Sequence, residues 1–287
     1  MNLTTNTRGT ALITGASNGI GLELARKMLT EGWEVIALVR SRMPESDAVI
    51  GTAVKENRLR TYHADLSDFD SLRAALEQIK AKESKIDVLF NNAGGSFDRL
   101  MYSKQGREMH YELQTVVPYI IYMELKELLR RGSQRTVVNT STAAFRFVKN
   151  FNPESLDRPS SFRKLIGPYA ESKLALSLWT RELGPAALAE EGIRLRSADP
   201  GGNNTLRKDK PSGLPLIVKL MMKMLMSPPS KGASLLYDAA LGNHRGETGV
   251  YLSKGNIAAL KYTEHGDRVL EKVKEVYERE YLAVPVS

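Results

Sequence analysis

Short runs rich in β-branched and other apolar residues alternate in this sequence with longer stretches of helical periodicity. Such alternation is typical of parallel strands joined by crossover helices that cover both faces of one sheet. The seven predicted strands are Thr10–Thr14, Trp33–Val39, Leu59–His63, Ile86–Asn91, Thr136–Thr140, Ile193–Ala198 and Gly249–Leu252. No internal repeat and no Pro-, Gly- or Ser-rich linker divides the 287 residues. One doubly wound α/β domain spanning residues 1–287 is therefore predicted.

A glycine-rich loop follows the first predicted strand and leads into a helical stripe formed by Ile20, Leu24 and Met28. Glycines let the backbone turn tightly and approach a pyrophosphate, while the helix N-terminus offers free N–H groups to the phosphates. Glycines also serve ordinary turns, but the strand–loop–helix setting favours dinucleotide binding. The predicted contacts are Gly15, Ser17, Asn18, Gly19, Ile20 and Gly21.

The end of the second predicted strand indicates which dinucleotide binds. An acid at this place holds the ribose 2′-hydroxyl of NAD, whereas arginine accommodates the 2′-phosphate of NADP. The strand ends at Val39 and is followed by Arg40, Ser41 and Arg42. NADP(H) is therefore the predicted cofactor, with Arg40 as its contact and NAD(H) as the alternative. The other interpretation of the two arginines is that they are solvated residues at the end of the strand. Asp65 and Leu66, after the third strand, are expected near the adenine, although Asp65 could equally cap the next helix.

Composition narrows the function classes. The chain has 41 Lys+Arg and 33 Asp+Glu, which give a net charge of +8. The basic residues are scattered along the chain and the sequence has no nucleic-acid recognition motif, so no nucleic-acid partner is expected. It has no cysteine, which excludes disulfides and a thiol nucleophile. The four histidines, His63, His110, His244 and His265, lack metal-ligand spacing, so no metal is expected and each is interpreted as an ordinary surface or core residue. A polar N-terminus and the lack of an apolar stretch of ~20 residues predict a cytoplasmic protein without an integral membrane segment.

Tyr169 and Lys173 lie four residues apart. On a helix this spacing puts the phenol and the ammonium on one face, one turn apart. A free tyrosine titrates near ~10, and an ammonium at about 5 Å with an effective dielectric constant of ~20 would supply about 3 kcal/mol toward lowering that pKa. The spacing alone is common on surface helices, so its place among other motifs decides its meaning.

The motifs together resemble the short-chain dehydrogenase/reductase family over roughly residues 8–255. They are, in the family's order, Thr14 to Gly21, Asn91-Asn92-Ala93-Gly94, Val138-Asn139-Thr140-Ser141-Thr142, Tyr169 to Lys173, and Pro200-Gly201 through Thr205. The resemblance implies a Rossmann-type domain with a seven-stranded parallel sheet and with the cofactor across the carboxyl ends of the strands. It also implies hydride transfer between the nicotinamide and a carbonyl or alcohol.

The resemblance further implies roles for individual residues. Tyr169 would protonate the carbonyl oxygen during reduction and act as base in reverse, while Lys173 would hold the nicotinamide ribose and depress the pKa of Tyr169. The adenosine side would be bordered by Asn91, Ala93 and Gly94. The nicotinamide and its phosphates would contact the turn that contains Pro200, Gly201 and Thr205.

Two positions depart from the family pattern. The usual catalytic serine aligns with Thr142, and Ser141 precedes it. Since successive strand side chains point to opposite faces, the two cannot easily exchange roles, and Thr142 is preferred. The family's usual asparagine aligns with Gln114, which carries the same amide on a longer arm.

Substrate identity is expected to depend on two segments. An inserted segment, 145–166, must pass near the active site, and the retinol-dehydrogenase-like branch resembles it in length and also shares Ser227-Pro228-Pro229; this favours a bulky or lipophilic carbonyl. The residues between Leu214 and Met226 have helical spacing, and the family resemblance implies that this stretch belongs to a substrate lid at about 206–231. The same pattern suits a core helix, a subunit contact or a membrane-surface contact.

A second function stays open from the sequence. Thr142 and Gln114 are compatible with a catalytically silent NADP(H)-binding regulatory or sensor protein, whereas the intact Tyr169 and Lys173 favour the enzyme. The family resemblance favours a homo-oligomer, but Gly184-Pro185 is expected to interrupt the helix that commonly forms the subunit interface.

Overall fold

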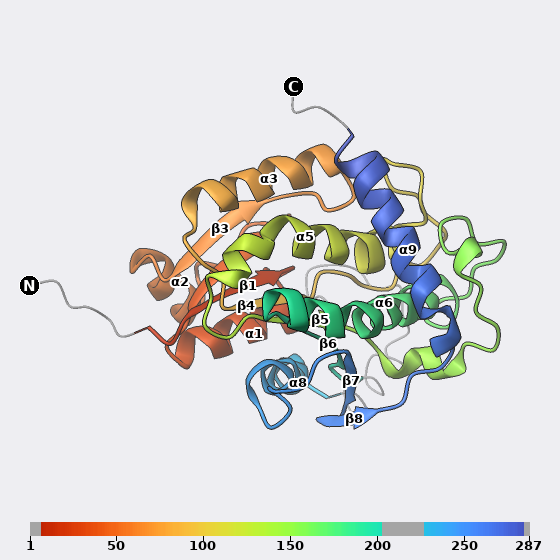
Figure 1. Ribbon diagram of the computed structural model, residues 1–287. Helices are drawn as coiled ribbons and strands as arrows, with labels where there is room; N and C mark the ends of the chain where they lie inside the picture. The colour runs from red at the N-terminus through yellow and green to blue at the C-terminus, as the bar shows by residue number, and fades with distance from the viewer. Residues whose placement is uncertain (1–6, 203–226, 284–287) are drawn as a thin grey trace, which may run out of the picture.

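The computed structural model describes residues 7–202 and 227–283 (Figure 1). Its eight-stranded sheet has the order β3-β2-β1-β4-β5-β6-β7-β8. The strands are β1 Thr10–Thr14, β2 Glu34–Val39, β3 Leu59–His63, β4 Val88–Asn91, β5 Thr136–Thr140, β6 Arg194–Asp199, β7 Val250–Ser253 and β8 Asn256–Ala258. The pairings from β3 through β7 are all parallel, which confirms the seven predicted strands.

The eighth strand was not predicted. β8 pairs antiparallel to β7 through a tight turn in which Lys254 and Gly255 have φ values of 53° and 81°. Two residues with positive φ are the geometry of a two-residue hairpin. The strand is only three residues long and its Ile257 is exposed, so it carries no apolar alternation for sequence reasoning to detect.

Helices cover both faces of the sheet (Figure 1). On one face α1 Gly19–Thr30, α2 Ala48–Lys55 and α8 Pro229–Leu241 pack on Ala11, Ile13 and Val35. On the other face α3 Phe69–Lys82, α5 Val117–Arg130, α6 Pro168–Glu191 and α9 Gly266–Val276 pack on Leu12, Leu89 and Val137. The doubly wound architecture is thus confirmed.

Shorter helical turns complete the described chain. α4 Met109–Tyr111 and the π-helical turn η1 Glu112–Val116 lead directly into α5. The 3-10 turn η2 Ala143–Phe147 leads into the inserted segment, and the 3-10 turn η3 Pro153–Ser155 lies within it. The 3-10 turn η4 Thr263–His265 precedes α9, and the π-helical turn η5 Tyr277–Tyr281 follows it. No helix among residues 7–202 and 227–283 is long and apolar enough to cross a membrane.

The expected interruption at Pro185 is wrong, because α6 continues from Pro168 to Glu191 with Pro185 inside it. Proline removes one backbone donor and normally costs a helix about 3 kcal/mol. Here the neighbouring Gly184 lies against the start of β7, and an added Cβ would come within 2.5 Å of Gly249 N. The hydroxyl of Thr248 donates to the carbonyl oxygen of Gly184 at 3.1 Å. Tertiary contacts to the β7 end therefore hold the helix through the proline.

The inserted segment is joined to the C-terminal part of the chain. The Glu154 carboxylate accepts from Arg268 at 2.6 Å and from Lys272 at 3.1 Å, both on α9. The carbonyl oxygen of Val148 accepts from Lys261 Nζ at 2.7 Å. In addition, the Phe151 ring lies 5.8 Å from the His265 ring. Ion pairs, hydrogen bonds and a ring contact thus connect this segment to residues 261–272.

Most of the predicted lid lies outside the described residues, as does Thr205. Its described end, Ser227 to Lys231, contains a hydrogen bond from Ser227 N to Gly202 O at 3.0 Å and the first turn of α8.

Candidate active site

The glycine-rich loop has the geometry that a pyrophosphate site requires. Gly15 and Gly19 have φ values of 70° and 54°, a region that favours glycine. A Cβ added at Gly21 would lie 2.3 Å from Gly15 O, so only glycine fits where α1 approaches the loop. Asn18 is the N-cap of α1, yet its side chain makes no capping hydrogen bond; it donates to Ser17 Oγ at 3.3 Å. The first N–H groups of the helix are thus not capped by that side chain, which fits an anionic phosphate at this place.

The loop after β4 packs on the same glycines. The Thr14 hydroxyl accepts from Asn92 N at 2.9 Å and from Ala93 N at 2.8 Å. A Cβ added at Gly15 would lie 3.0 Å from Ala93 Cα. The predicted contact Ala93 therefore lies beside the glycine-rich loop, because the parallel strands β1 and β4 bring their carboxyl ends together. Gly94 follows it and lies against Gln114.

The Asn91 side chain has a different position. It is buried, and its amide donates to Asn139 Oδ1 at 2.9 Å and to Pro118 O at 3.3 Å. These bonds tie β4 to β5 and α5. Asn91 thus stabilises the sheet, and its side chain makes its hydrogen bonds in the protein interior.

Arg40 and Asp65 lie at the carboxyl ends of β2 and β3. Arg40 directly follows β2 and is exposed. Asp65 Oδ1 accepts from Ser67 N at 3.0 Å and from Ser67 Oγ at 2.7 Å, whereas Asp68 is the N-cap of α3. The capping interpretation of Asp65 is therefore wrong, and Leu66 is half-buried against the core on the α3 face.

The carboxyl end of β5 meets the first turn of α6 at Tyr169. A side-chain hydrogen bond joins Tyr169 to Thr142. Ser141 instead lies in the interior, where its hydroxyl is 2.7 Å from Ser177 Oγ and donates to Lys173 O at 3.3 Å. Both residues directly follow β5, and the backbone is still extended at Thr142, so the two successive side chains point in opposite directions. Of the two candidate hydroxyls, only that of Thr142 is hydrogen-bonded to Tyr169.

Burial raises the pKa of Tyr169, and the nearby Asp199 carboxylate raises it further, while the Thr142 hydrogen bond opposes both. The expected lowering by Lys173 is not found in this arrangement. Lys173 Nζ donates to the carbonyl oxygen of Thr140 at 2.5 Å, and burial lowers the pKa of Lys173 to about 7. Lys173 is therefore only partly charged at neutral pH, which weakens its field at the phenol.

Gln114 lies in the π-helical turn η1 and is buried. Its Nε2 donates to Gly95 O at 3.3 Å, and its buried Oε1 has no partner among the described residues. A Cβ at Gly94 would lie 2.7 Å from this oxygen. Gln114 thus packs against the loop after β4, and its free acceptor needs a donor from elsewhere. Such π-helical turns occur often at functional sites.

The turn after β6 is held by Asp199, which sequence reasoning missed. Asp199 Oδ1 accepts from Gly201 N at 3.0 Å, and a second backbone hydrogen bond comes from Ala143. The carboxylate therefore bridges the turn that contains Pro200 and Gly201 to the residue after Thr142. No local signal marks this residue in the sequence, because the bridge joins two distant segments.

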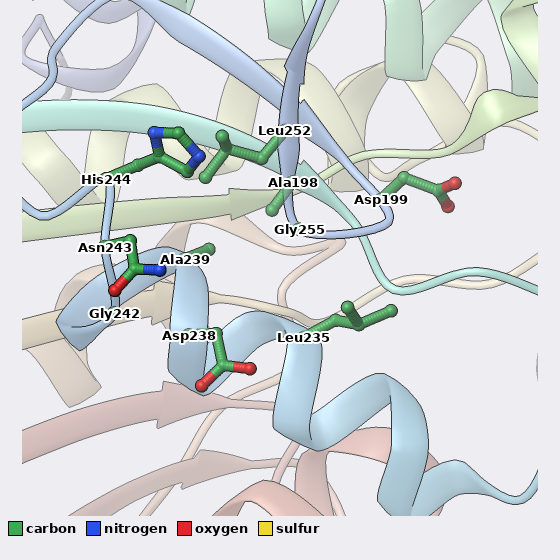
Figure 2. A pocket seen from close by; sticks show the side chains of 10 residues that line it. All are labelled: Ala198, Asp199, Leu235, Asp238, Ala239, Gly242, Asn243, His244, Leu252 and Gly255. Carbon is green, nitrogen blue, oxygen red and sulfur yellow. The ribbon is translucent and has the colours of Figure 1, made fainter.

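A cavity of about 260 Å³ opens beside the carboxyl end of β6 (Figure 2). It lies between β6, β7 and α8, with Asp199 and His244 at opposite ends of the view in Figure 2. Ala198 and Leu252 line the cavity, and α8 contributes Leu235 and Asp238 to the lining. The cavity places open volume next to the turn predicted to contact the nicotinamide.

A family model described as short chain dehydrogenase matches residues 9–153, about half of the 287 residues. The matched range contains the glycine-rich loop, Asn91 to Gly94 and Thr142, while Tyr169 and Lys173 lie beyond it. Human retinol dehydrogenase 12 is 32% identical over 194 residues, which are 66% of this chain and 60% of that protein. Human polyprenol dehydrogenase is 29% identical over 254 residues, 84% of this chain and 76% of that protein.

Solved structures show the same fold at low sequence identity. The Pseudomonas aeruginosa RhlG/NADP complex superimposes with a TM-score of 0.64 and 22% identity, covering 87% of this chain and 96% of that one. The NADH complex of 4-hydroxyisoleucine dehydrogenase gives a TM-score of 0.63 and 18% identity, with 86% and 96% coverage. NADP is bound in the first of these neighbours and NADH in the second, and at these identities the likeness shows the shared fold. From the matched family model, the shared sheet and the related sequences, the chain belongs to the short-chain dehydrogenase/reductase family of NAD(P)-dependent oxidoreductases and resembles its retinol-dehydrogenase-like branch.

Proposed function

We propose that the protein is an NADP(H)-dependent oxidoreductase that transfers hydride between the nicotinamide and a carbonyl or alcohol substrate. The observation that carries this proposal is the hydrogen bond between Tyr169 and Thr142 at the carboxyl end of β5, with Lys173 one turn further along α6. The uncapped start of α1 beside the tightly packed Gly15 and Gly21 supports the nucleotide part.

The chemistry follows from the two hydroxyl groups. The bound nicotinamide would supply or accept the hydride. Thr142 and Tyr169 would both bind the substrate oxygen, and Tyr169 would donate its proton to that oxygen during reduction. Burial and Asp199 raise the pKa of Tyr169 and so keep the phenol protonated, which favours its role as the acid. Lys173, held at Thr140 O, would bind and orient the nicotinamide ribose.

A bulky or lipophilic substrate is supported by the inserted segment. Phe147, Leu165 and Ile166 expose 70%, 50% and 38% of their surface, although each is apolar. A contiguous exposed apolar patch often marks the binding site of an apolar ligand or surface. The retinol and polyprenol named in two relatives are both lipophilic alcohols, in agreement with this proposal.

The test of the function is NADPH oxidation by the purified protein with aldehydes, ketones and quinones of graded size. We expect turnover that increases with the apolar size of the substrate. Tight NADPH binding without turnover on any of them would contradict the enzyme and favour the silent NADP(H)-binding protein.

Replacement of Arg40 by aspartate tests the cofactor preference. Because a charge-assisted hydrogen bond to the 2′-phosphate contributes about 1.5–3 kcal/mol, Arg40→Asp should weaken NADPH binding by roughly 10- to 100-fold. NADH binding should change little. Fluorescence titration of both nucleotides measures this, with Arg131→Asp as the control, because Arg131 is exposed at the end of α5 and precedes a strand rather than following one. Equal weakening of NADPH and NADH would refute the assignment.

Replacement of Asp199 by asparagine tests the charge beside Tyr169. Reduction requires the protonated phenol, so its rate should fall as the pH rises through the pKa of Tyr169. The Asp199 carboxylate raises this pKa, and the amide of Asp199→Asn keeps an acceptor for Gly201 N without the charge. The alkaline limb of the pH–rate profile should therefore move to lower pH. Asp238→Asn, at the same cavity, is the control and should leave the limb in place; an unmoved limb in Asp199→Asn contradicts the prediction.

A further inference from the structure

A buried glutamate–histidine pair lies behind Tyr169. The side chains of Glu108 and His110 are both fully buried. Glu108 is the N-cap of α4, where its Oε2 accepts from Tyr111 N at 2.9 Å. Its Oε1 lies 2.7 Å from His110 Nδ1. Two buried polar groups at this distance form a hydrogen bond that is costly to break.

The hydrogen bonds select one tautomer of His110. Its Nε2 accepts from the backbone N–H of Phe97 at 3.0 Å. A ring nitrogen that accepts carries no proton, so the proton of the neutral ring lies on Nδ1 and is donated to Glu108. Both ring nitrogens are therefore hydrogen-bonded, which fixes the orientation of the ring.

Three aromatic rings surround this fixed ring. The ring of Tyr169 lies 5.9 Å away at 78°, an edge contact. The Phe97 ring lies at 4.8 Å and the Phe162 ring at 6.3 Å. Phe97 belongs to the loop after β4 and Phe162 to the inserted segment, and both are half-buried. His110 is thus the point where these two segments and α6 meet.

We propose that His110, held by Glu108, is a positioning residue that sets the Tyr169 ring and holds Phe97 and Phe162 as an aromatic wall of the substrate site. This rests on the proposed oxidoreductase function. The wall favours a carbonyl attached to a flat, unsaturated ring over a saturated ring of the same size, because aromatic rings interact favourably through their edges and faces.

His110→Phe keeps a ring but removes both hydrogen bonds, and the isosteric Glu108→Gln leaves one of the two donors at Glu108 unsatisfied. We expect both variants to lower kcat/KM for benzaldehyde by about two- to tenfold more than for cyclohexanecarbaldehyde. NADPH affinity should stay within about twofold, since neither side chain lies at the nucleotide loop. His265→Phe is the matched control, because His265 also lies among aromatic rings, those of Phe151 and Tyr262, away from Tyr169.

A second readout needs no turnover. Nitrogen-15 spectra of histidine-labelled protein should show that His110 is protonated at Nδ1 and unprotonated at Nε2. Carbon-13 spectra of the tyrosine Cζ atoms, with Tyr169→Phe for assignment, should show the Tyr169 resonance shifted in His110→Phe and unmoved in His265→Phe.

The outcomes separate this proposal from the proposed function. A wild-type protein without turnover on any carbonyl would refute the function, while the two spectra still decide the role of His110. An Nε2-protonated His110, an unmoved Tyr169 resonance, or an equal loss of activity on both aldehydes would overturn the positioning role.

Discussion

Tyr169→Phe should lower the turnover of carbonyl substrate by about 10²- to 10⁴-fold, the usual contribution of a general acid. Phenylalanine keeps the ring, and with it the edge contact to His110 at 5.9 Å, but it removes the hydroxyl that is hydrogen-bonded to Thr142. Steady-state NADPH oxidation measures the loss. NADPH binding, followed by fluorescence, should survive because the glycine-rich loop is unchanged.

The control for this variant is Tyr237→Phe on α8, whose ring packs under Lys27 rather than in the site. It should retain the wild-type rate. Undiminished turnover in Tyr169→Phe would refute the acid role, and a parallel loss of NADPH binding would indicate a structural defect in place of a chemical one.

Arg196→Met should destabilise the fold by about 3–5 kcal/mol, because each buried acceptor left without its donor costs about 1–3 kcal/mol. Arg196 on β6 is fully buried and donates to the carbonyl oxygens of Glu247 at 2.6 Å and Ala239 at 2.5 Å. It also donates to Ala240 O at 3.2 Å and to Arg245 O. Burial lowers its pKa to about 10, so the side chain remains charged at neutral pH. Methionine fills a similar volume but leaves these four acceptors without their donor.

The midpoint of thermal unfolding measures the effect, and a decrease of roughly 6–20 °C is expected. Arg130→Met provides the control, since Arg130 pairs with Glu127 at 3.1 Å on the surface and should contribute about 0.5 kcal/mol or less. Arg196→Lys should recover only part of the loss because an ammonium cannot reach four acceptors in the same fork geometry. Equal midpoints for the two methionine variants would contradict the prediction.

The parallel sheet could be predicted because each of its strands is a buried apolar run followed by a crossover helix. Leu12, Ile36 and Leu89, for example, are fully buried on adjacent strands. β8 lacks such a pattern, since Asn256 and Ile257 are exposed and only the turn at Gly255 specifies it. The helix through Pro185 was beyond prediction for another reason. The contacts that stabilise it come from Thr248 and Gly249, more than sixty residues away.

Part of the site followed from local spacing. The separation of Tyr169 and Lys173 and the strand alternation of Ser141 and Thr142 are properties of single elements. The direction of Lys173 Nζ toward Thr140 O, the Asp199 charge and the contact of His110 with Tyr169 each join remote segments. His110 is a core histidine, one of the two expected possibilities. Its contact with Tyr169 could not be inferred from the spacing of the histidines in the sequence.

The bonds between the inserted segment and α9 have a consequence for altering the substrate range. Glu154 contacts both Arg268 and Lys272, and Val148 O contacts Lys261, so a foreign insert grafted alone would meet cations that it does not match. Chimeras that exchange residues 145–166 together with 261–272 should therefore express and fold better than those that exchange the insert alone. In this family member, the two stretches are expected to behave as a single interchangeable cassette, although almost a hundred residues of sequence separate them.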